Sequence, residues 1–137
     1  MKYLKPLILF FIGGFIYVLI EILWRGYSHI SMFFVGGLCF IIIGSLNEFY
    51  TYEMSLIRQM AISSIVITVI EFISGCILNI WLKLNVWDYS SAPFNLLGQI
   101  CIPYMFLWFL LSFLAIVIDD WIRYLFFNEE KPKYKIL

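Results

Sequence analysis

Four long apolar runs constrain this chain more than any other feature of its sequence. They cover residues 7–24, 30–46, 60–82 and 96–118, and each is near the ~20 residues that a helix needs to cross a bilayer. Hydrocarbon offers no partner to backbone N–H and C=O groups, so a helix, which pairs them internally, is the expected form of each run. Short connections favour antiparallel neighbours, so the sequence predicts an all-α polytopic membrane protein, a four-transmembrane-helix up-down bundle.

The composition fits this class and excludes several others. Hydrophobic residues make up 64% of the 137 residues and charged residues 13%, about half the share of a soluble domain. The formal net charge of zero gives no electrostatic attraction for nucleic acid. Cys39, Cys76 and Cys101 show no Cys-x-x-Cys spacing and His29 is the one histidine, so we expect neither a metal site nor a cofactor.

The distribution of Lys and Arg predicts the orientation. Four spans place both termini on one side of the membrane, and that side carries most of the positive charge. The side of the termini carries seven basic residues, Lys2, Lys5, Arg58, Arg123, Lys131, Lys133 and Lys135, whereas the other side carries Arg25 and Lys83. Positive charge is retained on the cytoplasmic side, so both termini are predicted to be cytoplasmic. We expect one transmembrane domain over residues 1–127 and a solvated cytoplasmic tail over 128–137.

Glu71 lies in the middle of the otherwise uncharged run 60–82. An ionisable side chain at that depth costs ~2.5–3.5 kcal/mol on insertion scales, which indicates a function. It shares one helical face with small and polar residues, at spacings of three and four. These are Ser64, Thr68, Gly75 and Asn79. The stripe is either a structural seam between helices or a binding or transport surface. No Lys or Arg lies at this level, which favours a neutral carboxyl or a bound cation.

Depth along the helices favours Trp108 over Glu21 as the partner of Glu71. At ~1.5 Å per residue, Glu71 lies roughly 16 Å below the outer boundary and Glu21 only roughly 5 Å. Glu21 instead precedes Arg25 by four residues, the better order for an ion pair on a helix. The indole N–H of Trp108 reaches the depth of Glu71 and is a donor, so we predict a hydrogen bond between them.

Pro103 lies inside the fourth apolar run. A proline there removes a helical hydrogen bond and leaves the carbonyl of Gln99 without its donor. The sequence therefore predicts a kink that opens the bundle near Asn95 and Gln99.

The two outer connections, about residues 25–29 and 83–95, are the densest polar region of the chain. Arg25 offers a planar fork for an anion, and His29 and Asp88 are candidates for an acid–base pair. A belt of interfacial aromatic anchors is the alternative interpretation. The predicted ligand-binding residues are Glu21, Arg25, His29, Glu71, Asn79, Asp88, Asn95 and Gln99.

At these positions the chain resembles the ABC-transporter type IV (CmpB-like permease) family of bacterial membrane proteins. The matching residues extend from Glu21 to Trp108, and the most specific block is Trp87-Asp88-Tyr89-Ser90 followed by Pro93, Asn95 and Gly98-Gln99. The other matches are Trp24-Arg25-Gly26, Ser28-His29, Gly36-Gly37, Gly44, Asn47, Gln59, Glu71, Gly75 and Asn79. The resemblance implies a multi-pass protein of the bacterial inner (cytoplasmic) membrane with a transport role. Because the chain has no Walker-type motif, an ATPase would be a separate chain.

Three functions are compatible with this pattern. The first is binding or translocation of a small polar or ionic solute, or of a lipid head group, by a permease subunit. A homo-oligomer would suit it, because one four-helix unit encloses little volume. The second is a membrane-embedded enzyme acting on a lipid or isoprenoid, with His29, Asp88 and Glu71 in acid–base roles. The third is a non-catalytic structural or regulatory subunit.

Overall fold

The described part of the chain forms four α-helices and one short hairpin. The computed structural model describes residues 4–50, with only the backbone for 47–50, together with 55–129, 131–134 and 136. The helices are α1 (Leu4–Arg25), α2 (Ile30–Tyr50), α3 (Leu56–Gly75) and α4 (Ile102–Phe127). A π-helical segment, η1 (Cys76–Trp81), extends α3, and strands β1 (Asn95–Leu96) and β2 (Ile100–Cys101) pair antiparallel before α4.

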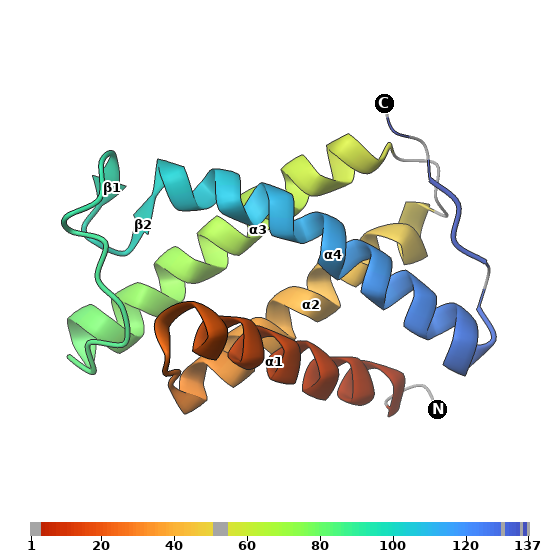
Figure 1. Ribbon diagram of the computed structural model, residues 1–137, viewed down its shortest axis with the longest axis horizontal. Helices are drawn as coiled ribbons and strands as arrows, with labels where there is room; N and C mark the ends of the chain where they lie inside the picture. Colours follow the sequence, from red (N-terminus) through yellow and green to blue (C-terminus); the bar gives the residue numbers. More distant parts are fainter. Residues whose placement is uncertain (1–3, 51–54, 130, 135, 137) are drawn as a thin grey trace.

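The helices run up and down along the long axis of the molecule (Figure 1). Both chain ends lie at one end, here named the terminal end, and the α1–α2 turn and the β1–β2 hairpin lie at the other, the loop end. The helix α1 packs mainly on α2, and α3 on α4, while α2 also contacts α3 and α4. The predicted all-α class is confirmed.

Three stretches of the described residues are long and apolar enough to cross a membrane. They are Leu4–Arg25, Leu56–Trp81 and Ile102–Phe127, and the apolar part of α2, Ile30–Leu46, is shorter. Their outward faces carry large exposed apolar side chains, such as Phe15 at 67% and Leu23 at 79% exposure. Exposed apolar surface of this kind suits a lipid environment.

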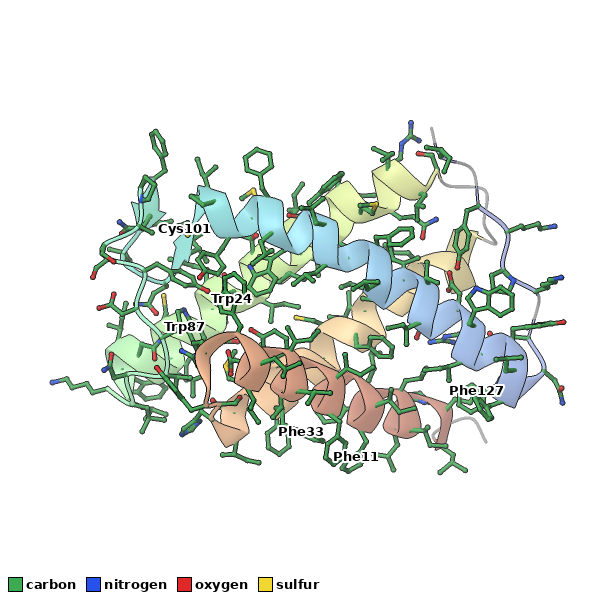
Figure 2. All side chains as sticks on the ribbon, viewed as in Figure 1. Phe11, Trp24, Phe33, Trp87, Cys101 and Phe127 are labelled. Carbon is green, nitrogen blue, oxygen red and sulfur yellow. The ribbon has the colours of Figure 1, made fainter. Side chains whose placement is uncertain are left out.

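Paired glycines bring α1 and α2 into close contact. Gly13 and Gly14 of α1 face Phe40 and Phe33, whereas Gly36 and Gly37 of α2 face Tyr17 and Phe10. A Cβ on Gly37 would lie 2.6 Å from the carbonyl oxygen of Phe10, and one on Gly14 would lie 2.6 Å from that of Phe33. Small residues are what allow two helix backbones to approach this closely in a membrane. The rings of Phe11 and Phe33 pack beside this contact, with centroids 5.6 Å apart (Figure 2).

The fourth helix differs from its prediction at both ends. It begins at Ile102, not near residue 96, because Asn95–Cys101 turns back in the hairpin. Pro103 therefore lies in the first turn of α4, where a missing N–H costs no helical hydrogen bond, and the predicted proline kink is wrong. The helix then continues past residue 118 to Phe127 and ends at Asn128, which is left-handed at φ 57°.

Beyond residue 118, α4 brings two acidic side chains into the protein interior at the terminal end. Asp119 and Asp120 are 0% and 1% exposed, and Asp119 packs against Gly44 of α2. Arg123 Nε donates to Asp119 Oδ2 at 2.9 Å, and the hydroxyl of Tyr134 donates to Asp120 Oδ2 at 2.9 Å. The C-terminal segment thus packs partly back on the helices instead of being fully solvated.

Candidate functional site

A cavity of about 340 Å³ lies at the loop end, between α1, α4 and the segment that follows η1. Its wall is mostly aromatic and aliphatic, with three charged side chains, Glu21, Arg25 and Glu71. The rest of the wall is Tyr17, Ile20, Leu23, Trp24, Met32, Trp87, Tyr89, Tyr104, Leu107, Trp108 and Leu111. A concave apolar wall with a few polar groups is the usual form of a small-ligand site.

Glu71 reaches this cavity from the C-terminal part of α3. Its side chain is buried, with 6% of the residue exposed, and it accepts two hydrogen bonds from aromatic donors. The hydroxyl of Tyr89 donates to Oε2 at 3.0 Å, and the indole of Trp108 donates to Oε1 at 3.3 Å. The predicted pairing of Glu71 with Trp108 is confirmed.

Aromatic rings surround the carboxyl group of Glu71. Tyr89 and Tyr104 stack with centroids 4.6 Å apart and planes 16° apart. The ring of Trp108 is 6.1 Å from Tyr104 and 6.2 Å from Tyr17. The site thus combines one carboxyl group, that of Glu71, with the four aromatic side chains Tyr17, Tyr89, Tyr104 and Trp108.

Glu21 and Arg25 form the second polar part of the wall. Arg25 Nη2 lies 3.3 Å from Glu21 Oε2, and the hydroxyl of Ser28 donates to the other oxygen of Glu21. Arg25 Nη1 donates to the carbonyl of Val86 at 3.0 Å, which ties α1 to the segment after η1. The Nη2 atom of Arg25 thus faces Glu21, whereas its buried Nε atom makes no hydrogen bond to the described residues. The guanidinium group of Arg25 is therefore used mainly within the protein, as the ion-pair partner of Glu21 and as a donor to Val86.

Asn79 and Gln99 hold the wall in place instead of lining the cavity. Asn79 Nδ2 donates to Gln99 Oε1 at 2.8 Å, while Asn79 Oδ1 accepts from the backbone N–H of Val86 at 2.7 Å. The carbonyl of Gln99 accepts from the indole of Trp87 at 3.0 Å. Trp87 lies at the loop end in Figure 2. These bonds fix the segment that carries Tyr89 onto η1.

Asp88 and Asn95 stabilise turns of the same segment. The backbone N–H of Ser90 donates to Asp88 Oδ1 at 2.9 Å and lowers the pKa of this exposed carboxyl group. Asn95 Oδ1 accepts from the N–H of Gly98 at 3.1 Å. The side chain of His29 is engaged elsewhere, at the start of α2, so the structure does not bring His29 and Asp88 together as an acid–base pair.

A second cavity of about 130 Å³ lies on the other side of Glu71, deeper among the helices. Six residues line both cavities, and the remaining lining of the second is almost wholly apolar; the shared residues are Tyr17, Ile20, Met32, Glu71, Trp108 and Leu111. Glu71 thus contributes to the walls of both cavities. Further along α3, the hydroxyl of Ser64 donates to the carbonyl of Met105 in α4 at 2.6 Å, so that part of the polar stripe is a helix seam.

Comparison with known families decides the relationship. A family model described as "Putative ABC-transporter type IV" matches residues 8–136. The chain belongs to this family. The description places this ABC-transporter type IV protein among ABC-transporter-related membrane proteins. No curated protein and no solved structure matches the chain.

Sequence reasoning missed the aromatic part of the site in this ABC-transporter type IV protein. Tyr17, Tyr89 and Tyr104 surround Glu71, but they come from α1, the segment after η1, and α4. Their common feature in the sequence is only that they flank polar positions, which many interfacial tyrosines also do. In the described part of the chain, no three His, Cys, Asp or Glu side chains converge where they could hold a metal ion.

Substitution of His29 tests its assignment as a helix cap. His29 Nδ1 accepts from the backbone N–H of Ser31 at 3.1 Å, in the first turn of α2. We expect His29→Ala to lower the free energy of unfolding by about 1 kcal/mol, as the loss of an N-cap does, and His29→Asn to retain most of it. Unfolding in mixed micelles with increasing dodecyl sulfate measures this. If ligand binding fell while the unfolding free energy stayed the same, His29 would belong to the site and not to the cap.

Proposed function

We propose that this protein binds or translocates a small polar or ionic solute, or a lipid head group, through the loop-end cavity, as a permease subunit. The observation that carries the proposal is the position of Glu71. Its carboxyl group lies in the wall of a cavity of about 340 Å³, and among the described residues it accepts hydrogen bonds from Tyr89 and Trp108, both uncharged. Keeping an ionisable group in a membrane-spanning helix is costly, and such groups mark substrate and ion pathways.

The orientation of the cavity follows from the positive charges. Lys5, Arg58 and Arg123 belong to the terminal end, whereas Arg25 and Lys83 belong to the loop end. Lys2 and Lys135 lie outside the described residues. With α2 counted as the fourth span, the positive-inside rule places both termini in the cytoplasm, and the cavity then faces outward from the bacterial inner membrane.

Partner chains complete the proposal. The family description points to ATP-driven transport, so a separate ATPase chain would supply the energy. A homo-oligomer would enlarge the translocation path, since the two cavities described above are modest in volume. The terminal end, with Arg58 and the charged C-terminal residues, is the surface that such an ATPase would meet in the cytoplasm.

Filling the cavity tests the proposal. Ile20 lines both cavities, so Ile20→Trp should fill the space, whereas Leu19→Trp points a similar ring outward from a residue that is 58% exposed. The two proteins are extracted from their own membrane with the surrounding lipid, and bound molecules are identified by mass spectrometry. We expect a specific molecule with the parent protein and with Leu19→Trp, and at least about tenfold less with Ile20→Trp. Identical small-molecule and lipid profiles in all three would overturn the proposal.

A further inference from the structure

The charges that face the loop-end cavity do not balance when Glu71 is ionised. Glu21, Arg25 and Glu71 are the charged residues of its wall. Arg25 lies 3.3 Å from Glu21, so these two charges compensate each other. Within the described part of the chain, the donors to Glu71 are the neutral Tyr89 and Trp108. When Glu71 is ionised, the cavity lacks one positive charge, which a cationic ligand would supply.

The carboxylate of Glu71 has room for a further partner. Each of its oxygens accepts one hydrogen bond from the protein. A carboxylate offers about four acceptor positions, so about two remain for a ligand. An ammonium group has up to three donors and suits these positions, whereas an anion would meet like charge.

The surrounding rings favour the same kind of ligand. Four aromatic side chains of the cavity wall form a continuous series of ring contacts, Tyr89–Tyr104–Trp108–Tyr17, with centroids 4.6, 6.1 and 6.2 Å apart. Aromatic faces attract ammonium groups through the ring quadrupole, and clusters of such rings recognise quaternary ammonium ions. An aromatic cluster without a carboxylate would serve a neutral apolar ligand equally well, but the two together select a cation.

We infer that the ligand of the loop-end cavity carries an ammonium group, bound between the Glu71 carboxylate and the rings of Tyr17, Tyr89, Tyr104 and Trp108. This inference rests on the proposed function, because it names the ligand class of the same cavity. A free amino alcohol and the head group of an aminophospholipid share this chemistry.

Isosteric probes test the inference without any substitution. The protein is placed in nanodiscs of phosphatidylglycerol, which has no ammonium group, and is titrated calorimetrically with choline, ethanolamine and 3,3-dimethyl-1-butanol. The last compound has the shape of choline with a carbon in place of the charged nitrogen. We expect choline or ethanolamine to bind at least about tenfold more tightly than the neutral isostere. In a second arm, nanodiscs that also contain phosphatidylethanolamine are examined by native mass spectrometry. Retention of this lipid, with no binding of the free amines, identifies the source as a head group and supports the inference.

Matched variants assign the binding to this cavity. Glu71→Gln keeps an acceptor oxygen for Tyr89 and Trp108 but removes the charge, so we expect at least about tenfold weaker binding of the ammonium probe. Tyr104→Leu should weaken it as well, whereas Phe15→Leu removes a ring that is 67% exposed away from the cavity and should not. The inference would be overturned if the neutral isostere bound as tightly as the amines, or if the protein retained phosphatidylglycerol in preference to phosphatidylethanolamine.

The variant Ile20→Trp distinguishes this outcome from failure of the proposed function. If Ile20→Trp blocked binding of the neutral isostere or of phosphatidylglycerol, the proposed function would stand and only the ammonium inference would fall. If no probe or lipid bound and Ile20→Trp had no effect, both the proposed function and the ammonium inference would be rejected.

Discussion

Replacement of Gly37 by leucine is expected to disrupt the pairing of α1 with α2. A Cβ at this position would lie 2.6 Å from the backbone oxygen of Phe10, and a backbone atom cannot rotate away as a flexible side chain can. The helices must therefore separate, and the dispersion contacts along their whole interface weaken. Overpacking costs about 1–3 kcal/mol in well-packed interiors, and we expect the upper end of that range or more because the obstacle is main chain.

The measurement is the midpoint of unfolding in mixed micelles, with yield of folded protein as a second readout. Gly37→Ala, which adds the Cβ alone, should fall between the parent protein and Gly37→Leu. The control is Leu38→Phe, which adds volume at the next residue of α2, where the side chain is 45% exposed and points outward. Equal unfolding midpoints for Gly37→Leu and Leu38→Phe would show that α1 and α2 do not pack through Gly37.

The helices and the pairing of Glu71 with Trp108 could be predicted because both follow from fixed helical geometry. An apolar run of suitable length defines a span, and a rise of ~1.5 Å per residue places two side chains at the same depth. The same geometry showed that Glu21 pairs with Arg25, as the 3.3 Å separation in the structure confirms.

The start of α4 could not be predicted from hydropathy, because the apolar run continues through the hairpin. Leu96, Leu97 and Ile100 are as apolar as the helix that follows. The available signals were Gly98, which adopts φ 72°, and Pro103, because proline is common in the first turn of a helix. The aromatic site could not be predicted because it depends on a tertiary contact. The segment after η1 folds back so that Tyr89 contacts Glu71, and no local sequence pattern indicates that contact.

Substitution of Arg25 by leucine is expected to have the largest effect at the loop end. The guanidinium group neutralises Glu21, whose side chain is only 10% exposed, and it donates to the carbonyl of Val86 at 3.0 Å. Arg25→Leu leaves Glu21 without its ion-pair partner in a largely apolar wall and removes the link between α1 and the segment that holds Tyr89. Removing one partner of a fully buried pair costs about 3–5 kcal/mol. Since the side chain of Arg25 is 22% exposed, we expect a smaller loss of unfolding free energy, about 2 kcal/mol.

The double variant Glu21→Leu/Arg25→Leu separates the two causes of this loss. Removing both charges eliminates the stranded carboxylate, so most of the lost stability should return if burial of an unpaired charge is the main cause. If the loss of the Val86 hydrogen bond dominates, the double variant stays as unstable as Arg25→Leu. Lys83→Gln, at the other cation of the loop end, is the control, because Lys83 is exposed and its loss should change stability little. An Arg25→Leu protein as stable as Lys83→Gln would mean that the pair contributes nothing to the cavity wall. Glu21 and Glu71 would then have to be treated as two equivalent carboxyl groups, instead of one that is neutralised within the protein and one that is open to a ligand.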